Sequence, residues 1–135
     1  MAPFAGRAAI HCGEEGDPSE MWEVLEYLKP RRVGHGILAA EDEKLMAELV
    51  RQNVVLEICP TSNIKTSAVQ NLEHVRRILR AFISQGVKFS ISTDGPEMLQ
   101  TNIAEEFELL VNNGVLTEKE AAAANRCAHE ASFLT

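Results

Sequence analysis

Short apolar segments rich in β-branched residues alternate with longer segments of helical periodicity along the whole of this 135-residue chain. The apolar segments at 7–12, 32–34, 54–59 and 87–92 are predicted strands, and a predicted helix follows each of them. Strands that alternate with helices pair in parallel through right-handed crossovers. The alternation therefore restricts the chain to an α/β fold built on a parallel sheet.

The predicted helices are amphipathic, and they cover 17–28, 41–51, 72–84, 101–113 and 118–131. In the segment 72–84 the apolar residues recur at helical spacing, and Gly86 ends the pattern. Thr117 and Glu120 occupy the two positions of a capping box in front of the last helix. The chain is thus predicted to contain four β/α units and one extra helix.

Two architectures fit this order: a small doubly wound sheet, or half of a (β/α)8 barrel, which normally needs about 250 residues. Polar or ionisable residues follow every predicted strand, namely His11 and Glu14, His35, the segment 61–63, and Asp94. A doubly wound sheet concentrates its functional residues at one crevice. In a barrel, all the strands end at one mouth. The distribution favours half of a TIM barrel.

Composition excludes several classes of protein. A formal net charge of −7 argues against binding to a phosphate backbone. No apolar run approaches the ~20 residues of a membrane span. Cys12, Cys59 and Cys127 form neither a disulfide framework nor a CxxC pair. We therefore expect a cytoplasmic protein with reduced thiols that binds neither nucleic acid nor membrane.

The residues after the strands suggest metal-assisted chemistry. His11 and His35 supply imidazoles and Asp94 supplies a carboxylate, a set that suits zinc or a similar divalent ion. Such an ion lowers the pKa of a bound water to about 7 and so provides hydroxide at neutral pH. Glu14, if it is not a ligand, is placed to carry a proton to a leaving group.

Each feature also has an ordinary structural explanation. A histidine at a strand end often only makes hydrogen bonds, and an Asp before Gly-Pro often forms a turn. The stretch 61–63 can shape the mouth without taking part in chemistry. The occurrence of all these features at successive strand ends nevertheless favours a functional site. His74 and His129 fall inside predicted helices, and Cys12 should point away from His11 into packing, so these three residues are left out of it.

Four stretches, "HCGE", "RVGHG", "LEICPTSN" and "STDGP", occur in this order and resemble the signature series of the adenosine deaminase family. A fifth, "ANRCAHEASFL", is similar to the closing helix of that family. The resemblance extends from about Arg7 to Leu134. It implies the C-terminal half of a (β/α)8 TIM barrel, one Zn²⁺ per complete site, and hydrolytic removal of ammonia from adenosine or a related amino-purine compound.

The resemblance also implies a role for individual residues. His11 and Asp94 match the zinc ligands of the family, and Asp94 also contacts the attacking water. Glu14 matches the acid that protonates the ring nitrogen beside the attacked carbon. His35 matches the histidine that orients this water and helps to activate it.

Gly95 departs from the usual pattern, because most similar adenosine deaminases carry a second aspartate there that hydrogen-bonds a ring nitrogen of the purine. Loss of that partner should change which base the site accepts, so we treat Gly95 as a substrate-binding position. The "TDG" form resembles subgroups that act on other adenine-containing compounds, including aminodeoxyfutalosine-type and adenine deaminases.

A second departure concerns the HxH pair on the first strand of the family's barrel, which supplies two further zinc ligands. This sequence contains no HxH. We therefore expect residues 1–135 to be the C-terminal part of a deaminase barrel, either as a fragment of a longer deaminase or as one half that awaits a partner. Two alternatives stay open: a non-catalytic fragment that keeps the fold, and a self-associating module in which two half-barrels close on each other.

Overall fold

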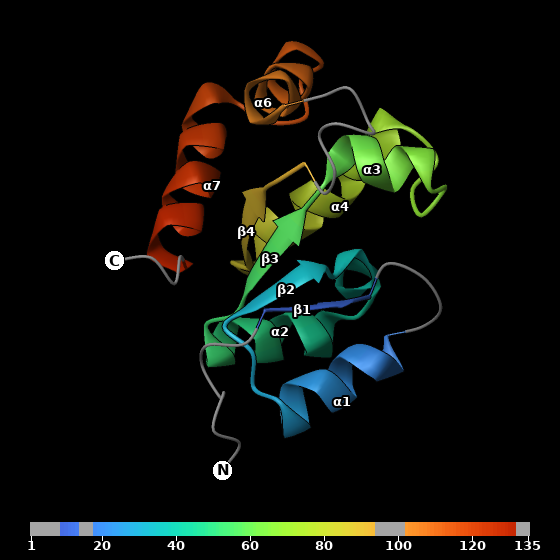
Figure 1. The fold of residues 1–135 in the computed structure, drawn as a ribbon, viewed down its shortest axis with the longest axis vertical. Coiled ribbons are helices and arrows are strands. Elements are labelled where there is room, and N and C mark those ends of the chain that lie inside the picture. Colours follow the sequence, from blue (N-terminus) through green and yellow to red (C-terminus); the bar gives the residue numbers. More distant parts are fainter. Residues whose placement is uncertain (1–8, 14–17, 94–101, 132–135) are drawn as a thin grey trace.

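The computed structural model of the chain describes residues 9–13, 18–93 and 102–131. The strands are β1 (Ala9–Cys12), β2 (Arg32–His35), β3 (Val55–Ile58) and β4 (Lys88–Ile91). The helical elements are α1 (Ser19–Tyr27), the short 3-10 helix η1 (Ile37–Glu41), α2 (Glu43–Gln52), α3 (Pro60–Lys65), α4 (Leu72–Gln85), α6 (Ile103–Asn112) and α7 (Glu118–Ala131) (Figure 1). Every predicted strand and helix is found, with ends that shift by a few residues. The elements η1 and α3 were not predicted.

The four strands form one parallel sheet in the order β1-β2-β3-β4. Each strand lies beside the one that precedes it in the chain, and the order never reverses. A doubly wound sheet reverses its strand order at the point where the two halves meet. The sheet is therefore an arc of a β/α barrel, as the sequence predicted.

The hydrophobic core lies between the sheet and its helices. Val33, Leu56 and Phe89 lie side by side in one register row and are buried. The helices contribute Met21 and Leu25 from α1, Leu45 and Leu49 from α2, and Leu79 and Phe82 from α4. Successive side chains of a strand point to opposite faces, so this row marks the helix-covered face of the sheet.

The opposite face of the sheet is polar. The neighbouring register row contains Gly34, Glu57 and Ser90, and the backbone of His11 pairs with Gly34 in the same row. Nε of Arg32 lies 3.5 Å from Oε1 of Glu57, and both side chains are about a quarter exposed (27% and 24%). Arginine and glutamate are rarely buried in a hydrophobic core unless they are paired, so this face differs in character from the helix-covered one.

The helix α7 begins with the predicted capping box. The backbone N–H of Thr117 donates to Oε1 of Glu120 over 2.9 Å, and the N–H of Glu120 donates to Oγ1 of Thr117 over 3.1 Å. Arg80 of α4 donates through Nη1 to Oε2 of Glu120 over 2.8 Å, and through Nη2 to the carbonyl of Val115 over 2.7 Å. These bonds anchor α7 beside α4, where it runs along β4 (Figure 1).

Cys12, Cys59 and Cys127 are free thiols. Among the helices of the described segments, none has the length and apolar character needed to cross a membrane.

Candidate active site

The carboxyl ends of β1 and β2 approach each other closely through glycines. Gly13 has a φ of +72° and Gly36 a φ of +69°, values that favour glycine. The N–H of Gly36 donates to the carbonyl of Cys12 over 2.8 Å, and the N–H of Leu38 donates to the carbonyl of Gly13 over 2.9 Å. A Cβ atom on Gly13 would lie 2.9 Å from the Cα atom of Gly36. The two glycines therefore allow the chain to cross itself at the strand ends.

His35, the last residue of β2, adopts a left-handed backbone with a φ of +69°. Regular alternation would place its side chain on the same face as Val33, but this φ breaks the extended geometry. A left-handed backbone costs about 1–2 kcal/mol for a residue with a side chain. The surroundings of His35 must therefore hold the residue in this conformation.

The imidazole of His35 is buried, with 5% of the residue exposed. Nδ2 of Asn63 lies 3.0 Å from Nδ1 of His35. An amide nitrogen can only donate, so in this arrangement Nδ1 accepts and a neutral ring carries its proton on Nε2. Turning the amide by half a turn would present Oδ1 instead and select the other tautomer.

Asn63 belongs to α3, which begins immediately after Cys59. Pro60 occupies its first position, where a proline is well tolerated because its missing N–H would have no partner inside the helix. The N–H of Asn63 donates to the carbonyl of Cys59 over 2.8 Å, and its carbonyl accepts from the N–H of Val69 over 3.1 Å. The segment that follows β3 is thus a short helix that places an amide beside His35.

A second buried polar contact joins α3 to α6. Glu106 is 1% exposed, and its Oε1 accepts from the backbone N–H of Thr61 over 3.1 Å. Its Oε2 accepts from Oγ1 of Thr61 over 2.6 Å. Sequence reasoning missed both Glu106 and the partnership of Asn63 with His35. The one sign of a buried Glu106 in the sequence is its spacing. The apolar Leu110 follows it one helical turn later, so both residues lie on the same face of α6.

The other predicted site residues are only partly described. The backbone of His11 lies in β1, one residue before the end of the strand. Glu14, Asp94 and Gly95 lie outside the described residues. In the sequence, Asp94 comes three residues after the end of β4. His11 thus belongs to one outermost strand of the sheet, and Asp94 follows the other outermost strand in the sequence; three strand spacings, or about 14 Å along a flat sheet, separate these two strands.

The donors available to a metal fit zinc by their chemistry. An imidazole from His11 and a carboxylate from Asp94 are ordinary zinc ligands. No cluster of three His, Cys, Asp or Glu side chains that could hold a metal occurs within the described segments, which exclude Asp94. Burial raises the pKa of the Cys12 thiol to about 11, with a smaller contribution from the charge of Glu20. Its thiol is therefore protonated at neutral pH, as expected for a residue that packs in the core.

The two remaining histidines lie away from these strand ends. Nδ1 of His74 accepts from the backbone N–H of Gln70 over 3.1 Å, just before the first turn of α4. His129 is exposed near the end of α7.

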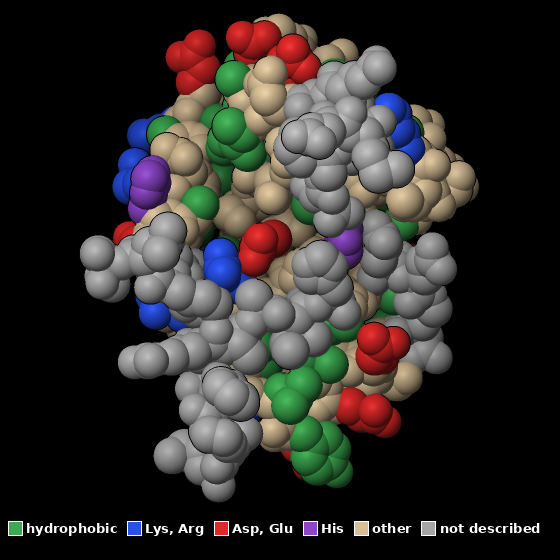
Figure 2. Space-filling view, viewed as in Figure 1, with side chains coloured by type: hydrophobic (Ala, Val, Ile, Leu, Met, Phe, Trp, Pro, Cys, Tyr) green, Lys and Arg blue, Asp and Glu red, His purple; other side chains and the backbone are tan. Residues whose placement is uncertain are grey.

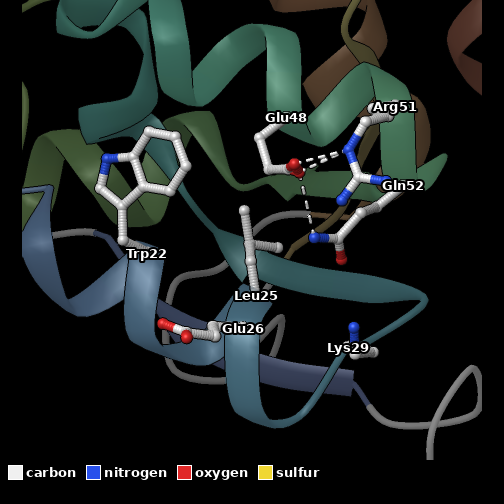
Figure 3. Close-up of a pocket in the computed structure, with 7 residues that line it drawn as sticks. All are labelled: Trp22, Leu25, Glu26, Lys29, Glu48, Arg51 and Gln52. Atoms are coloured by element: carbon white, nitrogen blue, oxygen red, sulfur yellow. Dashed lines mark hydrogen bonds and ion pairs between the residues drawn. The ribbon is translucent and has the colours of Figure 1, made fainter.

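A pocket of about 280 Å³ lies elsewhere, between α1 and α2. Its lining consists of Trp22, Leu25, Glu26, Lys29, Glu48, Arg51 and Gln52 (Figure 3). Nε of Arg51 donates to both carboxylate oxygens of Glu48, over 2.6 and 2.8 Å, and Nε2 of Gln52 donates to Oε2 over 3.3 Å. The pocket is on the helical layer, so we do not connect it with the residues at the strand ends.

Comparison with solved structures shows a barrel fold of the deaminase type. The adenine deaminase of Arthrobacter aurescens superposes with a TM-score of 0.85 at 30% identity, over 94% of this chain and 38% of that one. The N6-mAMP deaminase of Arabidopsis superposes with a TM-score of 0.75 at 28% identity, over 94% of this chain and 36% of that one.

Sequence comparison gives the family. Residues 5–135 match the family described as adenosine deaminase, and the chain belongs to this family. It is 37% identical over 128 residues to the aminodeoxyfutalosine deaminase of Streptomyces avermitilis. This alignment covers 95% of this chain and 35% of that protein. It is 39% identical over 114 residues to the adenosine deaminase of Yersinia enterocolitica, and this alignment covers 84% of this chain and 34% of that protein. The chain therefore spans about a third of the length of these relatives.

Proposed function

We propose that this chain is the C-terminal part of a zinc-dependent hydrolytic deaminase that releases ammonia from adenosine or a related amino-purine compound. The observation that carries the proposal is the placement of His35, a buried histidine in a left-handed backbone at a strand end, with its Nδ1 atom 3.0 Å from the Asn63 amide. Membership of the adenosine deaminase family supports the class of reaction.

In this proposal a water molecule adds to the ring carbon that bears the amino group, and ammonia leaves. Zinc held by His11, Asp94 and ligands from the missing half would supply the Lewis acidity that makes water a nucleophile at neutral pH. Glu14 protonates the ring nitrogen beside the attacked carbon. Asp94 and His35 orient the water, and His35 takes up its proton.

The proton-accepting role of His35 sets a requirement on Asn63. A neutral imidazole accepts a proton only on the ring nitrogen that carries none. With Nδ2 of Asn63 donating to Nδ1, the lone pair of the neutral ring is on Nδ1 and is engaged in that bond. Acceptance through Nε2 requires the turned amide, in which Oδ1 accepts from a protonated Nδ1.

In this proposal an N-terminal half, in the same longer chain or in a partner, completes the barrel. Within the described residues no strand pairs with the outer edge of β1 or of β4. Parallel sheets are stable when both faces and both edges are covered. The distance between the two outermost strands also requires a curved, closed sheet before His11 and Asp94 can bind one ion.

The substrate is proposed at the level of its chemical class. Relatives of similar identity carry the names aminodeoxyfutalosine deaminase, adenosine deaminase and adenine deaminase. Gly95 lacks the carboxylate that would bind a purine ring nitrogen, and this favours a substrate other than adenosine. The aminodeoxyfutalosine subgroup is therefore the first alternative within the class.

The test is a chimaera in which this chain replaces the matching segment of the Streptomyces avermitilis enzyme. Ammonia release is measured with adenosine, adenine and aminodeoxyfutalosine, and circular dichroism checks the fold. Release from at least one of these compounds, abolished in Asp94→Asn, supports the proposal. A folded chimaera without activity on any of them contradicts it and favours a non-catalytic chain.

A further inference from the structure

The helix α6 carries three glutamates that differ sharply in exposure. Glu105 and Glu108 are exposed, whereas Glu106 is 1% exposed. Figure 2 shows acidic side chains gathered at the end of the molecule where α6 lies. Burial of a carboxylate is costly unless hydrogen bonds compensate for the lost water. The two bonds from Thr61, to Oε1 and to Oε2, provide that compensation.

These bonds act on the start of α3. Cys59 is the N-cap residue of this helix, and its side chain makes no capping hydrogen bond. Pro60 has no N–H, so the N–H of Thr61 is the first backbone donor of the helix. Glu106 accepts it from a position 45 residues further along the chain. The cap that α3 lacks locally thus comes from α6.

The same short helix carries Asn63, two residues after Thr61. A helix of six residues is not stable on its own, so its orientation depends on contacts with the rest of the protein. One of these contacts is the bond between Thr61 and Glu106, and another is the approach of Asn63 to His35.

We propose that Glu106 is a positioning residue that holds α3, and through it the Asn63 amide, in register with the His35 imidazole. The effect on catalysis rests on the function proposed above, but the positioning itself does not. Figure 1 shows α3 and α6 at the end of the molecule towards which β3 points. His35 is the last residue of β2, the parallel neighbour of β3.

The direct readout is the tautomer of His35, observed by NMR of the full chain with ¹⁵N-labelled histidine and assigned with His35→Gln. We expect Glu106→Ala to move the ¹⁵N chemical shifts of the two His35 ring nitrogens towards the values of a mixture of tautomers. Glu106→Gln should restore the original signals, because its amide accepts the Thr61 N–H through oxygen and donates to the hydroxyl through nitrogen. Glu108→Ala, on the same helix and exposed, should leave the signals unchanged.

A merely structural tie between α6 and α3 would give a different result. Unchanged His35 signals in a folded Glu106→Ala protein would overturn the proposal, whatever the loss of stability. If Glu106→Ala does not fold, Thr61→Val takes its place in the test. This variant removes the hydrogen bond from the Thr61 hydroxyl to Glu106 and keeps the one from the Thr61 backbone N–H. Unchanged His35 signals in Thr61→Val would then overturn the proposal. Altered signals in Thr61→Val, together with parent-like signals in Thr61→Ser, would support it.

The chimaera adds a kinetic readout. We expect Glu106→Ala to lower kcat about tenfold, the lower end of the range seen when an outer partner of a metal-site residue is lost. A chimaera that is inactive with its natural Glu106 refutes the proposed function alone. The tautomer measurement still tests the positioning role in that case.

Discussion

Gly36 lies against Leu56 so closely that a Cβ atom at this position would be 2.8 Å from the Cδ2 atom of Leu56. Gly36 also has a φ of +69°, and its N–H bonds the carbonyl of Cys12. Two independent constraints therefore favour glycine at position 36: the lack of space beside Leu56 and the left-handed backbone conformation. This restriction fixes the chain on the C-terminal side of the candidate catalytic histidine.

Replacing this glycine should destabilise the fold more than its φ alone explains. We expect Gly36→Ala to lower the free energy of unfolding by about 2–4 kcal/mol, the sum of left-handed strain and overpacking. Gly86→Ala is the matched control, because Gly86 has a φ of +78° but no atom within 4 Å of the added Cβ. It should cost only about 1 kcal/mol. If urea denaturation shows equal losses in the free energy of unfolding for both variants, the Leu56 side chain moves aside without destabilising the fold.

The amide of Asn63 should matter for turnover. In the active chimaera we expect Asn63→Ala to lower kcat by about 10–100-fold, because His35 loses the partner that selects its tautomer. Asn113→Ala also removes an amide hydrogen bond, from Nδ2 to the carbonyl of Leu109, but at the exposed end of α6. Turnover of that control should be unchanged. A kcat of Asn63→Ala within twofold of the parent would exclude this role for the amide.

Glu120 makes stability depend on pH in acid. Its hydrogen bonds with Arg80 are the main cause that lowers its pKa from 4.5 to about 2. A carboxyl group with a lowered pKa stabilises the folded state above its unfolded pKa. This stabilisation is therefore complete above about pH 4.5 and is lost as the pH falls towards 2.

Glu120→Gln removes this dependence. Urea midpoints at pH 7, 4.5 and 3 should show a stability difference between parent and variant that is largest at pH 7 and shrinks at pH 3. Glu118→Gln changes the same charge at an exposed position of the same helix turn and serves as the control. A difference that stays constant over this range would mean that the Arg80 pair contributes no linkage.

The sequence predicted the fold more fully than the site. Local patterns were enough for the strands, for the end of α4 at Gly86 and for the capping box of Thr117 and Glu120, because each of these depends on near neighbours. Pro60 follows the predicted strand 54–59, where a proline is typical of a strand end although it serves equally well as the first residue of a helix. The helix α3 was missed for that reason.

The contacts around His35 could not be predicted because they join distant parts of the chain. Asn63 is 28 residues from His35, and Glu106 is 45 residues from Thr61. Within α6 the one local sign that Glu106 is buried is its spacing of one helical turn from the apolar Leu110, and the sequence does not indicate its partner. The bonds from Thr61 of α3 distinguish the buried Glu106 from the exposed Glu105 and Glu108. The roles of His11, Glu14, Asp94 and Gly95 stay predictions.

The acid role of Glu14 is open to a direct test in the chimaera. Glu14→Gln keeps the size of the side chain but cannot donate the proton to the ring nitrogen. Turnover should fall by about 10²-fold or more while the zinc content is unchanged. Glu15→Gln, at the next residue, controls for the change in charge. Loss of zinc or near-normal turnover in Glu14→Gln would rule out the assignment.

The central claim is that this chain supplies part of a zinc site that only a complete barrel closes. The most direct measurement is the zinc content by elemental analysis of the chain alone and of the chimaera. We expect close to one zinc per molecule in the chimaera, lost in Asp94→Asn, and far less in the chain alone. Stoichiometric zinc in the isolated chain, or a folded chimaera without zinc, would contradict the claim.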